Sequence, residues 1–411
     1  MLRRLHFLKF GILMTKVGLI LNVILFFIVY MLYFVFSVYV PLHFIPSGEY
    51  QLIVQALYNF VIVGGIIVTS FFIHKYDKLR VICVCAVAIS VLAPFLFFVY
   101  TDILRLMIIF GVALFSGVWQ LAFLTYFWSL TVPEERGRMA GFIVFVSLLL
   151  NLVTYTVIEG ILDYSMSIIL GITLSLCALM VTLLRPERAS LTTKKAEREG
   201  TYSEKRTILL YLSPWVLFTF INATLAKGIS FNISNQVPSS PYLFLTVLQI
   251  IATIFGALVG GVIADFFGRR GSLAFSLTLY GISSALAGIS GDYVLLCFVY
   301  VANGLSWGIL FVMYSFVIWG DLANKKNFAK VYAVGLITLY LTQGTGFLPL
   351  QQILRIPLVV SSLLSCLLIF LSIIPIFLAP ELLPAVFREK IRLKMHLRAL
   401  KKISRKSKNQ G

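Results

Sequence analysis

Residues 242–273 read YLFLTVLQIIATIFGALVGGVIADFFGRRGSL, and this stretch decides the class of fold. No charged side chain occurs in it before Asp265, and the run is apolar all round rather than on one face. An α-helix of about 20 apolar residues spans the hydrocarbon core of a bilayer. The stretch therefore predicts a transmembrane helix followed by a short charged loop that contains Arg269 and Arg270.

The rest of the chain follows the same pattern. Of its 411 residues, 60% are apolar and 12% are charged, and the mean hydropathy is +0.98. A soluble domain needs a more polar surface, and strands of a membrane barrel would alternate polar and apolar residues, which these runs do not. We therefore predict an all-α, polytopic membrane protein with twelve transmembrane helices. The apolar runs are 16–39, 50–73, 81–100, 104–128, 140–158, 165–184, 208–231, 242–265, 272–289, 293–318, 331–348 and 356–379.

One polar loop is longer than the others and divides the twelve runs into two sets of six. This loop covers residues 185–207 and is expected to be a cytoplasmic linker. It would join an N-terminal six-helix bundle, residues 1–184, to a C-terminal six-helix bundle, residues 208–379. Residues 380–411 form a basic cytoplasmic tail.

The positive charges indicate the orientation in the membrane. The net charge is +18, and 31 of the 34 lysines and arginines fall in alternate polar segments. These segments are 1–16, 74–80, 129–139, 185–207, 266–271, 319–330 and 380–411. Because basic loops stay in the cytoplasm, we predict a multi-pass plasma-membrane protein with both termini cytoplasmic. The tail has no aromatic side chains between its charges to stack on bases, so its expected partner is the lipid bilayer and not nucleic acid.

The two halves of the chain align when one is shifted by 191 residues. The matching positions are Gly65 with Gly256, Gly117 with Gly308, Trp128 with Trp319, and residues 74–78 with 265–269. One offset that pairs helices and loops indicates an internal duplication. Duplicated halves are typical of secondary transporters, which bind substrate between the repeats near the middle of the membrane.

Two loops carry motifs that resemble those of the major facilitator superfamily. The loop signature G-x-x-x-D-x-x-G-R-[RK] is matched by Gly261, Asp265, Gly268, Arg269 and Arg270. The string TVPEERGRMAG, residues 131–141, is similar to the family's loop between helices 4 and 5. The resemblance implies a major facilitator fold of two six-helix bundles and a transport function. It also implies gating roles for the five signature residues and for Glu135, Arg136 and Arg138.

The chemistry of the signature suggests how such a gate works. A glycine lets two helices pack closely. An aspartate at a helix end can bind an arginine and the N-terminus of a neighbouring helix. The expected first copy reads IHKYDKLR, with His74 in place of the aspartate and Asp77 in place of the glycine. Whether this copy still gates is open, and His74 is either a surface histidine or a pH sensor.

Amide side chains point to a cavity. In the family, helices 3, 6, 9 and 12 face lipid, and the runs expected for them contain no Asn or Gln, whereas each of the other eight contains at least one. Amides are unfavourable against lipid and need protein or water partners. The substrate-cavity residues that we predict are Asn59, Gln120, Asn151, Tyr155, Asn303 and Gln343. For each, the alternative is a hydrogen bond between helices without a ligand.

The middle of the predicted membrane region lacks charge. Arg105 and Lys227 fall near the outer interface, where they either snorkel to water or attract anionic solutes. A polar but uncharged cavity rich in aromatic residues suits a neutral or amphipathic solute. Both facilitated diffusion and coupling to a proton or ion through an edge carboxylate, such as Glu49 or Glu159, fit this pattern.

The sequence thus favours alternating-access transport of a small organic solute, with uptake and export both open. The alternative is a non-transporting scaffold or sensor with the same fold. An intramembrane enzyme needs a pair of catalytic groups at depth, and an ATP-driven pump needs G-x-x-x-x-G-K-[ST], neither of which occurs. The five cysteines have no metal-ligand spacing, so no catalytic residue, metal or cofactor is expected. The oligomeric state is open.

Overall fold

Helices account for nearly all of the residues that the computed structural model describes, which are 16–40, 49–158, 164–183, 205–289, 292–324, 326–348, 353 and 355–383. The first half contains α1 (Lys16–Phe34), η3 (Val35–Tyr39), α3 (Glu49–Phe72), η4 (Ile73–Lys75), α4 (Lys78–Phe98), α5 (Asp102–Leu130), α6 (Arg136–Ile158) and α7 (Tyr164–Leu183). The second half contains α8 (Lys205–Ala223), α9 (Leu225–Gln236), α10 (Ser239–Phe267), α11 (Arg269–Ile289), α12 (Tyr293–Val312), η5 (Met313–Val317), α13 (Ile318–Leu322), α14 (Phe328–Phe347) and α16 (Leu358–Leu378).

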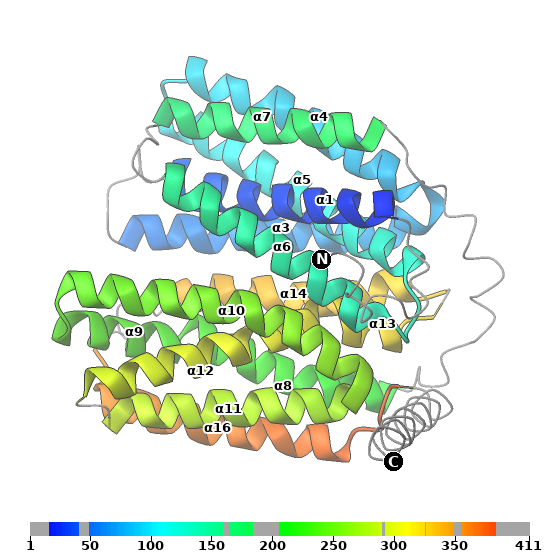
Figure 1. Ribbon diagram of the computed structural model, residues 1–411. Helices are drawn as coiled ribbons and strands as arrows, with labels where there is room; N and C mark the ends of the chain where they lie inside the picture. Colours follow the sequence, from blue (N-terminus) through cyan, green and yellow to red (C-terminus); the bar gives the residue numbers. More distant parts are fainter. Residues whose placement is uncertain are drawn as a thin grey trace, which may run out of the picture.

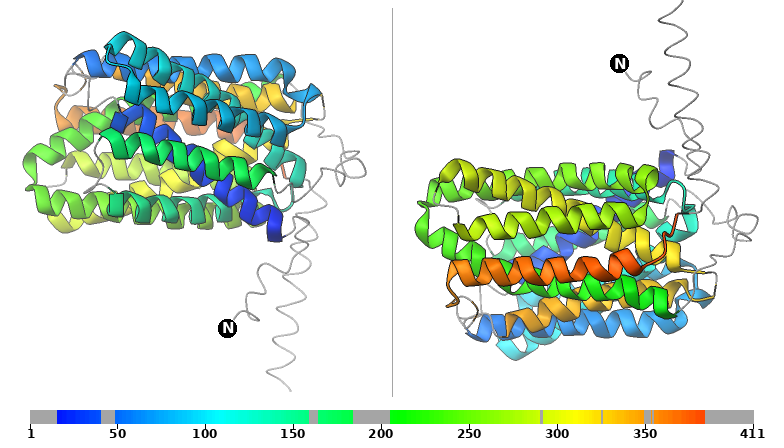
Figure 2. Two further views of the ribbon diagram at one scale, coloured as in Figure 1. Left: turned by 90° about the horizontal axis from the view of Figure 1, so that it is seen from above. Right: turned by 90° about the horizontal axis from the view of Figure 1, so that it is seen from below.

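The helices of each half lie together as a bundle of parallel and antiparallel rods. Figure 1 shows the first half above the second, and Figure 2 shows most of the rods running roughly along one direction, with α1 (dark blue) crossing at a slant. Across the seam between the halves, α3 packs against α14 and α6 packs against α10. The end of the molecule that carries the α3–α4, α5–α6, α10–α11 and α13–α14 connections is called the basic end below.

The helices are built to cross a membrane. Eleven spans within the described residues are long and apolar enough to do so. The predicted twelfth, 331–348, corresponds to α14, which has 20 residues but is less apolar. Lys330 near its start and Gln343 within it lower its hydropathy most. The all-α, twelve-helix prediction is therefore confirmed, and the lower hydropathy of α14 fits its place at the seam rather than against lipid.

The helices that the family resemblance assigns to lipid lie on the outside of the structure. These are α4, α7, α11 and α16, and they pack in the pairs α4 with α7 and α11 with α16. Large apolar side chains on α4 and α16 are exposed, among them Phe98 and Leu367. In a protein whose solvent is lipid, such exposure is favourable because hydrocarbon tails cover these side chains.

The internal duplication recurs in the helix packing. A Cβ atom at any of the four matched glycines would overlap a backbone carbonyl oxygen of the neighbouring helix. The blocking oxygens belong to Leu114 for Gly65, Ile62 for Gly117, Leu305 for Gly256 and Thr253 for Gly308. These partners are again 191 residues apart, so α3 packs on α5 as α10 packs on α12. Close backbone approach at small residues is a favoured way to join helices in a membrane.

Several rods depart from regular α-helix, including α1, which continues into the π-helical turn η3; two of these departures lie in the second half. The run predicted over 208–231 is divided at Thr224, which has φ −122° and ψ −85° and separates α8 from α9. The Thr224 hydroxyl donates a hydrogen bond to the Phe220 carbonyl at 2.6 Å. The rod that begins as α12 passes through the π-helical turn η5 into α13. Such interruptions occur often at functional sites.

The predicted basic tail lies almost wholly outside the described residues, which end at Leu383, and so does most of the linker 185–207. The interaction of the tail with lipid stays a prediction.

Candidate functional site

A cavity of about 200 Å³ lies at the seam between the two halves. The first half contributes side chains from α1 and α5, and the second from α12, η5 and α14. The lining residues are Phe26, Val29, Tyr30, Tyr33, Gln120, Phe123, Leu124, Trp307, Phe311, Ser315, Phe316, Leu336, Leu339, Tyr340 and Gln343. A site shared by both halves can change its access when the halves move relative to each other.

The wall of this cavity is mainly aromatic. The rings of Trp307 and Phe311 stack with their centres 5.0 Å apart, and Phe26 from α1 contacts Phe123 from α5 with 5.7 Å between ring centres. Phe316, from η5, lies edge-on to Phe26 at 5.3 Å. Aromatic faces bind the apolar faces of ring-shaped solutes. Sequence reasoning missed these residues, because aromatic side chains occur throughout the chain and only the amides were selective.

A few polar groups break this apolar wall. The Tyr340 hydroxyl donates to the Gln120 side-chain oxygen at 2.5 Å, which joins α14 to α5 across the seam. Gln343 lines the cavity three residues beyond Tyr340. Of the six predicted substrate-cavity residues, the structure brings Gln120 and Gln343 to the cavity.

Three of the predicted residues lie outside the lining. The Asn59 amide donates to the Gln55 carbonyl at 2.7 Å, and its oxygen accepts from the Tyr33 hydroxyl at 3.2 Å, so it stands behind the lining residue Tyr33. Asn303 accepts a hydrogen bond from Gln249 at 2.7 Å, which links α12 to α10. Asn151 donates to the Ser147 carbonyl within α6 at 2.7 Å. The side chain of Tyr155 lies outside the described part of the structure.

At the basic end, the halves are joined around Asp265, the single carboxylate of α10, which is buried. Its side chain accepts hydrogen bonds from the backbone amides of Gly137 at 3.0 Å and Arg138 at 2.8 Å, at the N-terminus of α6. The Arg138 guanidinium adds a third bond at 3.0 Å. A carboxylate is favourable at this position because the first amides of a helix lack intrahelical partners and carry partial positive charge.

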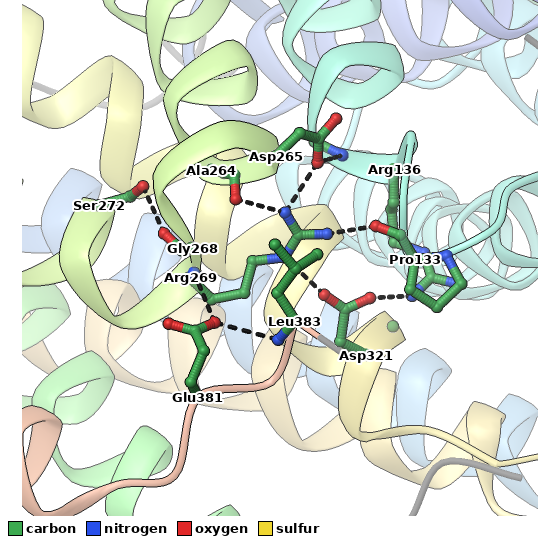
Figure 3. A network of polar contacts seen from close by, with 12 residues as sticks. Pro133, Arg136, Ala264, Asp265, Gly268, Arg269, Ser272, Asp321, Glu381 and Leu383 are labelled. Atoms are coloured by element: carbon green, nitrogen blue, oxygen red, sulfur yellow. Dashed lines mark hydrogen bonds and ion pairs between the residues drawn. The ribbon is translucent and has the colours of Figure 1, made fainter. Parts of the chain in front are cut away.

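Arg269 connects this carboxylate to a second one. Its guanidinium donates to Asp265 at 2.7 Å and to Asp321 at 2.7 Å, and it also bonds the Pro133 carbonyl. The other oxygen of Asp321 accepts from Arg136, which opens α6. Figure 3 shows Arg269 between the two aspartates, with Arg136 and Pro133 reaching in from the first half. Both aspartates are almost fully buried, so each charge needs these partners.

Sequence reasoning missed Asp321. It lies on α13, in the segment DLANKKNFAKVYAVG, which matches the layout of residues 131–141 but not their letters. The sequence did offer one signal. Asp321 is a lone carboxylate shortly after the apolar run 293–318, and the offset of 191 residues aligns it with the residue just before the first-half loop 131–141.

Glu381 is a second missed residue and belongs to the second half alone. Its carboxylate accepts from the backbone amides of Arg269 at 2.8 Å and Arg270 at 3.1 Å, which caps the start of α11. Gly268 precedes these amides with φ +99°, a conformation that glycine adopts readily. The Arg270 side chain lies over the Phe377 ring, 5.4 Å from its centre.

Close backbone contact supports the joint between the halves. A Cβ atom on Gly261 would come within 2.9 Å of the Gly141 Cα atom, and α6 and α10 touch there without side chains between them. Glu135, just before α6, is buried with an exposed fraction of 2%. Thus all eight residues predicted to gate lie at or next to this basic-end network.

The degenerate copy of the signature forms a different contact. His74 is exposed at the end of α3, and Asp77 caps α4 within its own half by accepting from the Leu79 amide at 3.2 Å. Near this copy, Trp128 donates to the Gly320 carbonyl at 3.0 Å and stacks on Phe328 with ring centres 4.9 Å apart. The exposure of His74 fits a surface histidine, and aromatic packing takes the place of a charged clasp here.

Comparison of the sequence with known protein families gives a match in the second half of the chain. The family model described as "Sugar (and other) transporter" matches residues 212–375. No curated protein sequence matches the chain.

Several solved structures share the fold at low sequence identity. The proton:xylose symporter XylE, with 6-bromo-6-deoxy-D-glucose bound, is 15% identical, with a TM-score of 0.66 over 88% of this chain and 94% of its own. The human organic anion transporter TETRAN is 11% identical, with a TM-score of 0.69 over 87% and 97%. The E. coli fucose:proton symporter FucP is 12% identical, with a TM-score of 0.61 over 88% and 98%.

Identities this low establish the fold and say nothing of the substrate. The family match lies in the second half, whereas the structural matches extend over both halves. The chain therefore has the fold of major facilitator transporters, and its second half matches the sugar (and other) transporter family model.

Proposed function

We propose that the protein moves a small organic solute across the membrane by alternating access between its two helical bundles. The observation that carries this proposal is a cavity lined from both halves and separated from the basic end by a bonded network between them. Release of that network would open the cavity towards the basic end. Closure on the other side would complete the cycle.

The network contains bonds that must break and bonds that can persist. Arg136 with Asp321, Arg138 with Asp265, and Trp128 with Gly320 all join one half to the other. By contrast, Arg269 binds Asp265 and Asp321 within the second half, and these ion pairs stay intact when the halves separate. Each aspartate thus keeps a partner in both states.

This division keeps the two states close in free energy. Removing the only partner of a buried charge is strongly unfavourable, whereas a charge that keeps one partner and gains water is far less so. The buried ion pairs also stabilise the closed state less than their number suggests, because the cost of removing the charges from water offsets much of their attraction. A transporter needs such a balance, since a state favoured by several kcal/mol would stop the cycle.

The orientation of the molecule in the membrane is inferred from the positive-inside rule. It puts the basic end in the cytoplasm, so the structure corresponds to a state closed on the cytoplasmic side. The same rule supports cytoplasmic placement of both termini, and we propose the plasma membrane as the location.

The cavity chemistry favours a solute with a flat apolar face and a few hydrogen-bonding groups. Aromatic rings form most of the wall, while Gln120, Gln343 and Tyr340 offer polar contacts. No carboxylate or histidine lines the cavity as far as the structure describes it. Coupling to a proton, if the cycle uses one, would therefore depend on residues away from the solute, such as Glu49 or Glu159 at the edge.

Binding and flux measurements test this proposal. Purified protein in detergent is screened by thermal shift against sugars, amino acids, organic acids and lipophilic cations, since a ligand of the native fold raises its melting temperature. A solute that binds is then followed into proteoliposomes. We expect counterflow of that solute, and its loss in Gln120→Ala with Gln55→Ala as the control outside the cavity lining. Binding without flux would refute transport and indicate a sensor or scaffold with this fold.

A further inference from the structure

A lysine lies inside a membrane-spanning segment of the second half. Lys227 is in the first turn of α9, within the apolar span Lys205–Gln236. Its Nζ atom is buried and has no hydrogen-bond acceptor among the residues that the structure describes. The Phe347 ring lies 3.7 Å away, measured from Nζ to the ring centre. A snorkelling lysine would hold its ammonium group in water, so this interpretation of Lys227 does not fit.

The surroundings of Lys227 favour an anion. The break at Thr224 creates a new helix N-terminus, and no side chain caps it, because the Thr224 hydroxyl donates to Phe220 instead. A helix N-terminus carries partial positive charge that adds to the charge of the ammonium group in its first turn. The face of the Phe347 ring attracts the ammonium group through its quadrupole, but the ring has no oxygen or nitrogen atom that could accept a hydrogen bond.

The position of Lys227 relates it to the cavity. Phe347 follows the lining residue Gln343 by four residues on α14, so the two side chains lie on the same face, one turn apart. Gly346 packs against Ala223, the last residue of α8, so closely that a Cβ atom on Gly346 would lie 2.7 Å from the Ala223 oxygen. This contact fixes the break between α8 and α9 beside the end of α14 that points away from the basic end.

We propose that Lys227 binds the anionic group of a solute whose aromatic or apolar body occupies the cavity. The inference rests on the proposed transport function and narrows the solute class to organic monoanions, such as carboxylates. A carboxylate at Lys227 would supply the acceptor that Nζ lacks and would compensate a buried charge. Trp307 and Phe311 would contact the body of the solute, and the Gln343 amide would lie between the two parts.

A pair of probes with one shape and different charge tests the assignment. Binding of 3-phenylpropionate and of 3-phenylpropionamide to the purified full chain is measured by isothermal titration calorimetry. We expect the carboxylate to bind at least about tenfold more tightly than the amide, because a charged hydrogen-bond partner replaces a neutral one. Lys227→Gln should reduce this ratio to about one, and Lys227→Arg should largely restore it.

Arg105→Gln is the matched control. Arg105 lies in the first turn of α5 and already has partners, with the Val99 carbonyl at 3.0 Å and Asp102 at 3.5 Å. Its loss should leave the ratio unchanged. The assignment is wrong if wild-type protein binds the amide as tightly as the carboxylate, if it binds neither, or if Lys227→Gln keeps the preference. An internal partner for Lys227 would show itself as a lower melting temperature of Lys227→Gln with unchanged selectivity.

The outcomes separate this inference from the transport function. Flux that persists together with an unchanged ratio in Lys227→Gln would refute the anion site alone. A carboxylate preference that depends on Lys227 but no flux of any bound solute would refute transport and keep the site.

Discussion

Neutralising Asp265 should shift the protein towards a state that is open at the basic end. In Asp265→Asn the side chain keeps its shape but loses its charge. The wild-type carboxylate accepts three bonds from the first half, at 2.8–3.0 Å, from the Gly137 amide and from the amide and guanidinium of Arg138. The bond to Arg269 lies within the second half. Its loss therefore destabilises the open and the closed state equally and does not change the equilibrium between them.

The magnitude follows from those three bonds. A hydrogen bond to a charged group contributes about 1.5–3 kcal/mol net, and the asparagine oxygen still accepts from one or two donors. We therefore expect a loss of about 3 kcal/mol from the closed state, which changes the ratio of closed to open protein by roughly 100-fold. The melting temperature should also fall, because Arg269 loses one of its two buried counter-charges.

Spin-label distances report this shift. Lys75 and Lys330 are exposed and lie on opposite halves at the basic end, so labels at Lys75→Cys and Lys330→Cys follow the separation by double electron–electron resonance. We expect a longer-distance population to dominate in Asp265→Asn. Asp77→Asn is the control, because Asp77 is exposed and caps α4 within its own half. A distance distribution in Asp265→Asn that equals those of wild type and Asp77→Asn would refute the reasoning.

Three further predictions use the same structure. Glu381→Gln should lower the free energy of unfolding by about 1–3 kcal/mol without changing the Lys75–Lys330 label distances, since the bonds of Glu381 among the described residues lie within the second half. A shift in those distances would contradict this assignment. Gly308→Ala should reduce the yield of folded protein, measured by size-exclusion chromatography, because its Cβ would meet the Ala257 nitrogen at 2.7 Å. Gly64→Ala is the control and should leave that yield unchanged, because Gly64 faces open space. Tyr340→Phe should weaken solute binding roughly fivefold in calorimetry through the loss of the bond that orients Gln120, and unchanged affinity would exclude that role.

Much of the fold could be predicted from the sequence. In lipid a backbone must satisfy its own hydrogen bonds, so each long apolar run has to be a helix, and hydropathy locates it to within a few residues. The run 242–265 became α10, Ser239–Phe267. Hydropathy could not find the break at Thr224, because the apolar character continues across it from α8 into α9.

The candidate site was harder to predict, because the same residue types serve two purposes. An amide within a membrane span either lines a cavity, as Gln343 does, or bonds another helix, as Asn303 does with Gln249. The choice depends on which face of the helix meets the seam. Asp321 was missed for a related reason: its partner Arg136 is 185 residues away in the chain, and only the packing of the two halves brings them together.

The central claim is that solute crosses when the two bundles separate at the basic end, and a reversible crosslink tests it directly. Lys78 lies near the Phe328 ring across the seam, 5.7 Å from its centre. In a variant with Lys78→Cys and Phe328→Cys as its only cysteines, a reducible bis-methanethiosulfonate linker holds the halves together. Counterflow in proteoliposomes should stop on crosslinking and return on reduction. Undiminished flux in the crosslinked protein would contradict alternating access through this seam.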